Sequence, residues 1–210
     1  MNTMPGAQVE VYDDIACPWC RLGTHQFHRA AEGTDVELVH RPFQLMPDAP
    51  VDPRPAMDEV VALFGKEQAE AMLSGMTELG ASEGIEYRFD RAIAVNTLTA
   101  HRLRWFALRE HGAAVQAALA TSLFDAYFRD GVDISDHTHL ARLAEQVGMS
   151  GGRVRDFLAT EEGVAEVREQ VAAARRDGVI TVPRFVFENG ALVIGVTSTK
   201  ALGVAIREAR

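Results

Sequence analysis

The stretch Cys17-Pro18-Trp19-Cys20 tells most about how this chain folds, because regular patterns surround it on both sides. Residues 8–12, shortly before it, alternate polar and apolar side chains, which predicts a short β-strand. Residues 21–32, directly after it, are mostly helix formers and are followed by a glycine that can end a helix. The two cysteines are therefore expected where a strand passes into the first turn of a helix.

Strand patterns occur near both ends of the chain. Residues 36–43 predict a second strand, so that the chain begins with a βαβ pattern. Near the C-terminus, Asn189-Gly190 is a two-residue turn typical of β-hairpins, and Ser198 can cap a final helix. The strands expected in this part are residues 179–182, 184–188 and 191–194.

The middle of the chain carries helical periodicity instead of strand patterns. Residues 46–56 contain four prolines, which excludes a regular helix or a central strand and indicates a connection. Gly80 and Gly148 are expected to end two of the helices, and Ser135 or Asp136 is expected to cap the fourth. The helical patterns lie around residues 69–79, 95–108, 115–126, 140–147, 154–158 and 164–174.

This arrangement predicts one α/β domain whose sheet is interrupted by a large α-helical insertion. A chain of 210 residues suits a single large domain or one domain with an insertion. We place the sheet-containing domain, which is discontinuous, at residues 1–50 and 178–210, and the insertion at residues 51–177. Neither half could bury the faces of its sheet alone.

The composition limits the partners that this protein can have. Charged residues make up 24% and hydrophobic residues 47% of the chain, a normal balance for a globular protein with a buried core. The formal net charge is -9 and there is no basic run, which disfavours nucleic-acid binding. No apolar run approaches the ~20 residues that span a bilayer, and residues 1–6 do not resemble a signal peptide. The sequence therefore predicts a cytoplasmic protein without a membrane or nucleic-acid partner.

The chain contains two cysteines, and their spacing suits dithiol chemistry. Thiol–disulfide exchange needs one thiolate that attacks a disulfide and a second thiol that resolves the mixed disulfide. Free N–H groups at a helix start stabilise a thiolate, so we expect Cys17 to be an exposed nucleophile with a lowered pKa. Cys20, one turn further on, is expected to be the shielded, resolving thiol. Pro18 fits the first helical turn, and Trp19 is expected to be a partly exposed substrate contact.

Two other interpretations of the cysteine pair are weaker. The pair could be two ordinary buried cysteines, although a strand–CxxC–helix context favours a redox motif. It could bind zinc with His25 and His28, but four ligands within twelve residues would be strained, and there is no second CxxC pair. We therefore expect no metal site, and we expect His137 and His139 to be ordinary residues near a helix start.

Charged residues near the motif have both functional and structural interpretations. Asp13 or Asp14 could accept a proton from the motif or tune its thiols, or both could be solvated residues that finish the strand. Arg41 could attract an anionic substrate or simply face water. His101 lies among apolar helical residues and is expected to be a core histidine.

A set of short segments, in the same order along the chain, resembles the DsbA-like thioredoxin-fold family of the FrnE type. The set covers nearly the whole chain, which makes it more specific than a CxxC motif alone. The resemblance implies a thioredoxin-like fold with a large α-helical insertion and the activity of a thiol–disulfide oxidoreductase or isomerase. The segments are Asp14-Ile15-Ala16-Cys17-Pro18-Trp19-Cys20 with Gly23, Arg41-Pro42-Phe43-Gln44-Leu45, Asn96-Thr97, Ala100-His101-Arg102, Leu123-Phe124, Ala126-Tyr127-Phe128, Asp133-Ile134-Ser135-Asp136, Gly178-Val179, and Val182-Pro183 with Phe185.

The resemblance also implies a substrate-binding turn that faces the cysteines. In this family the counterpart of Val182-Pro183 is a cis-proline turn that presents backbone groups to an extended substrate. Arg184 after the proline and Gly195-Val196-Thr197 near the last strand depart from the family pattern at the rim of the groove, and they leave the substrate preference open. The expected substrate-binding residues are Pro18, Trp19, Val182 and Pro183.

These observations lead to one main hypothesis and two alternatives. The main hypothesis is a thiol–disulfide oxidoreductase/isomerase, with Cys17 as nucleophile and Cys20 as resolving thiol, that acts on disulfide-containing proteins or small molecules. It needs no cofactor besides its dithiol, although glutathione could be a reductant or co-substrate. One alternative is a glutathione-dependent isomerase or transferase for a small aromatic substrate, similar to 2-hydroxychromene-2-carboxylate isomerases and kappa-class transferases, although the two cysteines argue against direct membership. The other is a non-catalytic binding module with a metal or chaperone role.

Overall fold

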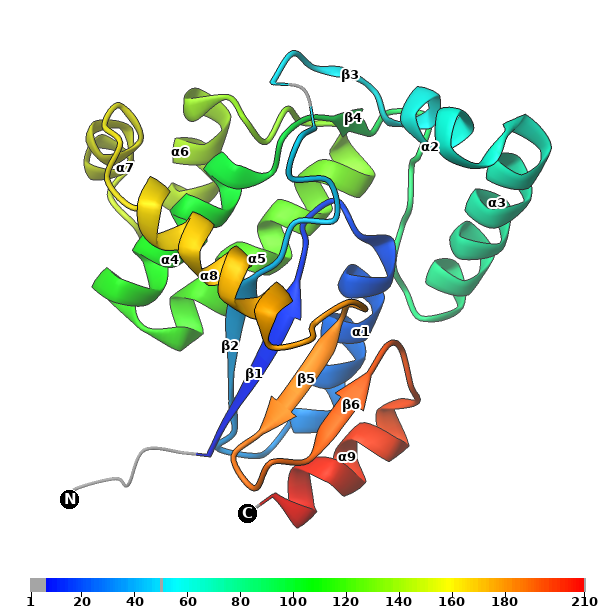
Figure 1. The fold of residues 1–210 in the computed structure, drawn as a ribbon. Coiled ribbons are helices and arrows are strands. Elements are labelled where there is room, and N and C mark those ends of the chain that lie inside the picture. Colours follow the sequence, from blue (N-terminus) through cyan, green and yellow to red (C-terminus); the bar gives the residue numbers. More distant parts are fainter. Residues whose placement is uncertain (1–6, 50, 210) are drawn as a thin grey trace.

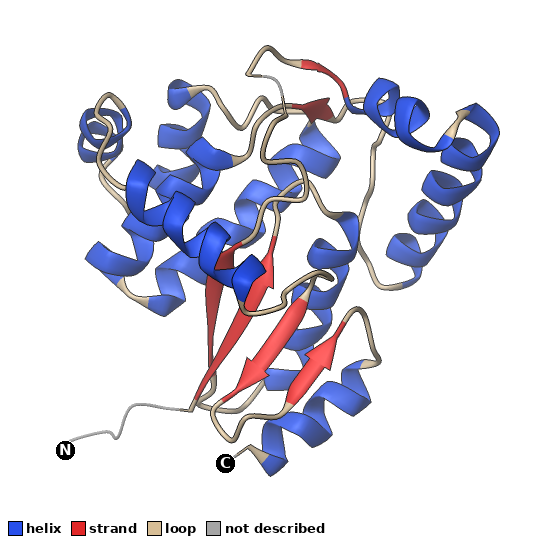
Figure 2. Ribbon diagram, in the orientation of Figure 1, coloured by secondary structure: helices blue, strands red, loops and turns tan. Residues whose placement is uncertain are grey.

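The computed structural model describes residues 7–49 and 51–209, and a four-stranded mixed sheet lies at its centre (Figure 1, Figure 2). The strand order is β2-β1-β5-β6. β1 pairs in parallel with β2 and antiparallel with β5, and β5 pairs antiparallel with β6. The first strand is thus held between its neighbour in the sequence and a strand from the C-terminal part. The strands are β1 (Gln8–Asp13), β2 (Glu37–Pro42), β5 (Arg184–Phe187) and β6 (Leu192–Ile194).

Helices α1 (Pro18–Ala31) and α9 (Thr199–Glu208) pack against each other and bury one side of the strands. Val9 of β1 and Phe185 of β5 contribute to this core, because alternate residues of a strand point to the same face. Phe27 of α1 stacks on Phe185, with the ring centroids 5.4 Å apart. The alternation of polar and apolar side chains along β1 therefore provides the apolar face of the sheet against which α1 packs.

The predicted turns and caps near the helix and strand ends are confirmed. Asn189-Gly190 joins β5 to β6: the side chain of Asn189 accepts a hydrogen bond from the N–H of Ala191, and Gly190 has a φ of 84°. Ser198 Oγ accepts from the N–H of Ala201 at 3.2 Å and caps α9. Asp136 is the residue that caps α6.

The other helices lie between β2 and β5 in the sequence, and of these α4, α5 and α8 contact β2 (Figure 1). A short two-stranded sheet pairs β3 (Arg54–Pro55) with β4 (Ile93–Ala94). Within residues 7–49 and 51–209, no helix combines the length and the apolarity needed to cross a bilayer. The helices are α2 (Ala56–Phe64), α3 (Lys66–Ser82), α4 (Leu98–His111), α5 (Ala113–Asp125), the π-helical turn η1 (Ala126–Asp130), α6 (His137–Gln146), α7 (Gly151–Leu158) and α8 (Val164–Arg176).

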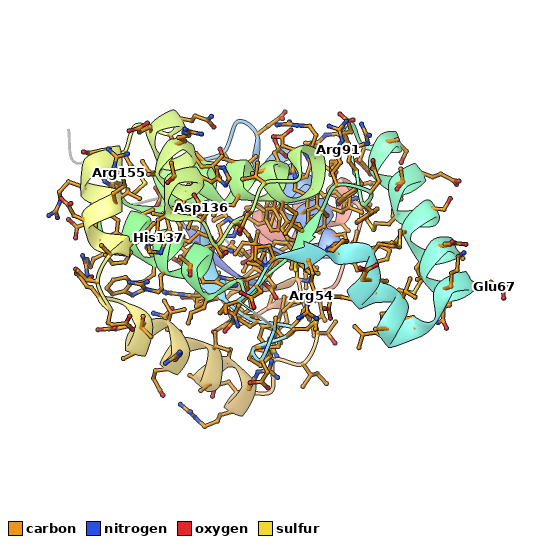
Figure 3. All side chains as sticks on the ribbon, turned by 90° about the horizontal axis from the view of Figure 1, so that it is seen from above. Arg54, Glu67, Arg91, Asp136, His137 and Arg155 are labelled. Carbon is orange, nitrogen blue, oxygen red and sulfur yellow. The ribbon has the colours of Figure 1, made fainter. Side chains whose placement is uncertain are left out.

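Helices α2 and α3 lie together at one side of the molecule, as the view from above shows (Figure 3). Arg54, at the inner end of this pair, forms an ion pair with Glu59 of α2 at 3.1 Å. Glu67, at the outer side, points away from the rest of the chain. The hydrophobic periodicity of the sequence did not predict α2 as a separate helix.

Two expectations about individual elements are wrong. Gly80 does not end its helix, since α3 continues to Ser82; it is buried, and the ring of Tyr87 occupies the space that a Cβ atom would need. Close packing, and not a turn, thus requires this glycine. Residues 179–182 form no strand, because they carry the chain from α8 into the turn at Val182-Pro183. The division into residues 1–50 with 178–210 and an insertion at 51–177 stays a prediction.

Candidate active site

Cys17 is the N-cap residue of α1, where the chain leaves the sheet and begins the helix. Its Sγ accepts a hydrogen bond from the N–H of Cys20 at 3.4 Å. Pro18 occupies the first helical turn, as predicted. This N–H group and the helix dipole favour negative charge on the sulfur of Cys17. The start of α1 is therefore suited to hold a thiolate.

Both cysteines are buried, so the expectation of an exposed Cys17 is wrong. Cys17 is 3% exposed and Cys20 is fully buried. The reason is that Cys17 lines a pocket instead of the outer surface. Burial, followed by the hydrogen bond with Cys17 and the charge on Cys17, raises the pKa of Cys20 well above its ordinary value. Cys20 therefore keeps its proton while Cys17 reacts, as a resolving thiol should.

The Val182-Pro183 peptide bond is cis, as the family resemblance implied, and the turn lies against α1. A Cβ atom on Gly23 of α1 would lie 2.7 Å from Cγ of Pro183. Val182 belongs to the same cluster of buried side chains as Cys17 and Cys20. The turn thus lies against the helix that begins at the cysteine pair, although the two segments come from opposite ends of the chain.

Arg184, which departs from the family pattern, and Gly195 both donate hydrogen bonds to the backbone of this segment. Arg184 donates a hydrogen bond from Nη1 to the C=O of Gly178 at 3.0 Å, which ties the two ends of the segment together. Gly195 donates its N–H to the C=O of Pro183 at 2.8 Å and has a φ of 76°, a conformation that suits glycine. Both hydrogen bonds therefore act on the backbone around the proline.

We expect the Gly23→Ala variant to be about 1–3 kcal/mol less stable than the wild type, because Pro183 or α1 must move to admit the methyl group. Urea unfolding would measure the change. Gly75→Ala is the matched control: Gly75 is exposed within α3 and nothing lies within 4 Å of an added Cβ. That variant is expected to gain about 0.5–1 kcal/mol. Equal stability of Gly23→Ala and the wild type would contradict a tight contact with the proline.

Trp19 is 46% exposed, as expected, and lines the same pocket as Cys17 and Pro18. The pocket has a volume of about 330 Å³. Its other walls come from α2, α3, the segment after β2, β4 and η1. Because these segments are far apart in the sequence, no local pattern predicted the pocket.

Tyr87, which no sequence pattern marked, contacts the Cys17–Cys20 motif from the helical part of the chain. Its hydroxyl donates a hydrogen bond to the C=O of Pro18 at 2.7 Å. Burial raises the pKa of Tyr87, so the hydroxyl remains a donor. Tyr87 lies in an irregular segment between α3 and β4, where periodicity carries no signal.

Asp13, at the end of β1, takes part in a buried ion pair behind the motif. It is fully buried; Oδ1 accepts from Nη2 of Arg104 at 2.5 Å and Oδ2 from Nδ1 of His40 at 2.7 Å. Burial alone would raise the pKa of Asp13, but the charge of Arg104 and the contact with His40 outweigh it and lower the pKa to about 2. Burial and the charge of Arg104 lower the pKa of His40, so we assign a neutral ring with the proton on Nδ1. The interpretation of Asp13 as a solvated residue is wrong.

Asp14 is buried as well, and it connects the motif to the wall of the pocket. Its Oδ2 accepts from the N–H of Leu45 at 2.8 Å, and its Oδ1 lies 3.2 Å from Nε2 of His101. Its C=O accepts from the N–H of Cys17 at 3.1 Å. His101 is 1% exposed, which confirms the expectation of a core histidine. Asp14 therefore fixes both the start of the motif and Leu45, which lines the pocket.

The low pKa of Asp13 predicts a loss of stability in acid. An aspartate titrates near ~3.9 in an unfolded chain, whereas Asp13 titrates at about 2 in the fold. Its ionised form therefore stabilises the fold above pH ~4, and this contribution of about 2 kcal/mol is lost as the pH falls toward 2. Urea unfolding across this pH range would measure it. The free energy of unfolding should depend less on pH in Asp13→Asn than in the wild type. It should depend on pH as in the wild type in Asp156→Asn, whose carboxylate is exposed on α7. Equal slopes in the two variants would contradict the assignment to Asp13.

The remaining polar candidates lie outside this cluster. Arg41 forms an ion pair with Glu10 of the neighbouring strand at 2.5 Å, so its charge is already partnered. His139 lies with Nδ1 3.3 Å from the C=O of Asp133, near the start of α6. In the part of the chain that the structure describes, no group of three or more His, Cys, Asp or Glu side chains could hold a metal ion.

Comparisons with known proteins agree with this geometry. The profile of the DSBA-like thioredoxin domain family matches residues 8–207. A solved structure of a probable DsbA oxidoreductase from Streptomyces coelicolor is similar with a TM-score of 0.86 at 30% identity, over 97% of this chain and 89% of that chain. The uncharacterized protein YwbO from Bacillus subtilis is 28% identical over 180 residues, which is 85% of each chain. The predicted thioredoxin-like fold is thereby confirmed.

A more distant likeness concerns the fold alone. The structure of a 2-hydroxychromene-2-carboxylate isomerase is similar with a TM-score of 0.68 at 15% identity, over 96% of this chain and 93% of that chain. At this level of identity, the shared arrangement of helices and strands carries no information about the reaction. The chemistry has to be argued from the side chains around Cys17.

Proposed function

Because this chain belongs to the DSBA-like thioredoxin domain family, we propose that it is a thiol–disulfide oxidoreductase with Cys17 as nucleophile and Cys20 as resolving thiol. The observation that carries the proposal is the position of Cys17 Sγ at the start of α1, where the N–H of Cys20 donates to it. The side chain of Cys20 lies close to that of Cys17, since Cys17 is one of the causes that raise the pKa of Cys20. The FrnE type and the cytoplasmic location are parts of the same proposal.

The proposed reaction transfers two electrons from the dithiol to a substrate disulfide. The Cys17 thiolate attacks one substrate sulfur, forms an S–S bond with it and releases the other sulfur as a thiolate. The sulfur of Cys20 then attacks that of Cys17, its proton goes to a departing thiolate, and the second substrate sulfur leaves. The enzyme ends as the Cys17–Cys20 disulfide and the substrate as two thiols. A reducing cytoplasm favours this direction over its reverse.

The turn before β5 is the proposed contact for the backbone of a peptide substrate. No residue in 7–49 or 51–209 hydrogen-bonds to the N–H or the C=O of Val182. Both groups therefore have no partner within the described residues, and we assign them to pair with an extended substrate chain, as in strand addition. Pro183 keeps the turn against α1, and Trp19 and Pro18 offer apolar surface in the pocket that Cys17 lines.

Trapping the mixed disulfide tests the two roles separately. In Cys20→Ser, Cys17 still attacks but nothing resolves the product. We therefore expect reduced Cys20→Ser, mixed with insulin, to accumulate a covalent adduct in nonreducing gel electrophoresis that disappears with dithiothreitol. Cys17→Ser is the matched control and should form no adduct. A missing adduct in Cys20→Ser, or an equal one in the control, would refute the assignment.

A second candidate function is favoured by the apolar pocket beside Cys17. A glutathione-dependent isomerase or transferase needs a hydrophobic site for a small aromatic substrate next to the sulfur, and this pocket offers one. Such a reaction needs one thiolate and no resolving thiol. Glutathione-dependent turnover that survives Cys20→Ser would support this candidate, and turnover lost in Cys20→Ser would exclude it.

A further inference from the structure

The pocket beside Cys17 has the size of a small-molecule site. Its volume of about 330 Å³ falls at the lower end of the range, roughly 300–1,000 Å³, that such sites occupy. Cys17 and Trp19 lie on one side of it, and Leu63, Phe64 and Met72 of the α2–α3 pair lie on another. A molecule bound here would therefore lie against the reactive sulfur.

The walls formed by α2 and α3 leave apolar side chains uncovered. Leu63 is 61% exposed, Phe64 is 45% exposed and Met72 is 43% exposed. Contiguous exposed apolar surface on a folded protein commonly marks a binding site. Since all three side chains line the pocket, an apolar ligand that fills it would cover them.

The charges in the pocket exclude an anionic ligand. Among the described residues that line it, the carboxylates are Asp14 and Glu59, and there is no lysine, arginine or histidine. Asp14 is held by Leu45 and His101, and Glu59 by Arg54. An anion would find no partner for its charge, and a cation would lose its water against apolar walls. These surroundings favour an uncharged ligand over glutathione, which carries two carboxylates.

Tyr127 brings a hydroxyl group to the lining of the pocket. Tyr127, in η1, is 4% exposed, and no described residue hydrogen-bonds to its hydroxyl. Burial and then the charges of Asp14 and Glu59, which line the same pocket, raise the pKa of Tyr127. The hydroxyl therefore stays protonated and is available as a hydrogen-bond donor. The hydroxyl is not among the fully enclosed polar atoms that lack a partner, so a ligand that brings an acceptor oxygen can take its hydrogen bond in place of water.

We propose that this pocket binds an uncharged aromatic disulfide, and that an acceptor oxygen on its ring takes a hydrogen bond from Tyr127. The inference rests on the proposed function, because the bound disulfide is the one that Cys17 attacks. Cys17 forms a bond with the nearer substrate sulfur, the other leaves as an aryl thiolate, and Cys20 resolves the product as described above. The two electrons come from the reduced dithiol.

Three diphenyl disulfides test the proposal directly. The para-acetyl compound is uncharged and has an acceptor, the para-ethyl compound is uncharged without one, and the para-carboxy compound is anionic. Each rate with the reduced enzyme, measured by stopped flow, is divided by the rate with dithiothreitol to remove intrinsic reactivity. We expect the acetyl compound to react at least about tenfold faster than the carboxy compound and about 3- to 10-fold faster than the ethyl compound.

Two comparisons between enzyme variants test whether these rate ratios arise in the pocket. Tyr127→Phe should abolish the preference for the acetyl over the ethyl compound. Met72→Glu, which adds a charge to the wall, should slow the acetyl compound about tenfold. Leu79→Glu is its matched control, because Leu79 is 37% exposed on the same helix but does not line the pocket; its rate should equal that of the wild type.

The possible results separate this inference from the proposed function. If the three corrected rates are equal, or if Met72→Glu and Leu79→Glu behave alike, thiol exchange stands and the ligand class is refuted. If insulin reacts faster than the acetyl compound and Met72→Glu slows it equally, the pocket is a peptide site and the proposal fails. If no disulfide reacts faster with the wild type than with Cys17→Ser, the proposed function itself fails.

Discussion

Replacing Cys17 with serine is expected to lower the rate of insulin reduction by a factor on the order of 10³ or more. A serine hydroxyl is not ionised at neutral pH, so the variant has no thiolate at the start of α1. Cys20 cannot replace it, because its side chain is fully buried and its pKa is raised. The turbidity of insulin reduced in the presence of dithiothreitol measures the rate.

The fold has to be intact for this loss to identify a nucleophile. The Cys17→Ser substitution exchanges only a sulfur for an oxygen at a position that is 3% exposed. The circular dichroism spectrum of the variant should therefore match that of the wild type. Cys20→Ser keeps the attacking sulfur and serves as a second control, since it should still consume one disulfide per chain. Wild-type reduction by a folded Cys17→Ser would show that another group reacts.

Replacing Arg104 with methionine is expected to destabilise the fold by about 3–5 kcal/mol, the typical result of removing one partner of a buried ion pair. Arg104 is 2% exposed, and its guanidinium pairs with Asp13, which is fully buried. Methionine keeps an unbranched apolar stem like that of arginine but lacks the guanidinium, and it leaves the carboxylate charge with the neutral ring of His40 as its remaining partner. Urea unfolding at neutral pH measures the difference.

A second variant tells whether the unpaired charge causes this loss. Asp13→Asn combined with Arg104→Met removes both charges, so the pair of substitutions should cost less than Arg104→Met alone. Arg142→Met changes an exposed arginine on α6 and should stay within about 0.5 kcal/mol of the wild type. If Arg104→Met and Arg142→Met were equally stable, Arg104 would not hold the charge of Asp13.

The sequence predicts the parts of the fold that depend on short-range patterns. The strand before Cys17, the helix after it, the hairpin at Asn189-Gly190 and the cap at Ser198 each follow from residues within one or two turns. The cis peptide bond at Val182-Pro183 was implied by the resemblance alone, because few X–Pro bonds are cis and no local residue requires it.

The parts that depend on contacts between distant residues were missed. The sequence around Asp13 indicates only the end of a strand, yet Arg104 of α4 and His40 of β2 both hydrogen-bond to its carboxylate. One signal was present, since Arg104 follows His101 by three residues and so shares its apolar helix face. Gly80 was misread for a similar reason, because Tyr87, which requires it, lies beyond the end of the helix.

The burial of Cys17 shows how one error arose. A residue at a helix start is commonly open to solvent, so exposure was the natural expectation. The structure places α2, α3 and η1 around this helix start, and none of these elements carries a pattern that points toward the motif. Their arrangement converts an open thiol into one that is reached through a pocket.

The order β2-β1-β5-β6 also determines when the protein can fold as it leaves the ribosome. β1 and β2 emerge before the helices α2 to α8 and can pair, while the other edge of β1 waits for β5, which follows those helices in the sequence. The intervening helices have mostly local contacts and can form in the meantime. A nascent chain stalled before Arg184 would present an open strand edge and the bare apolar surface of α1 to chaperones. Release of the C-terminal hairpin and α9 from the exit tunnel is thus the event that ends this period of exposure.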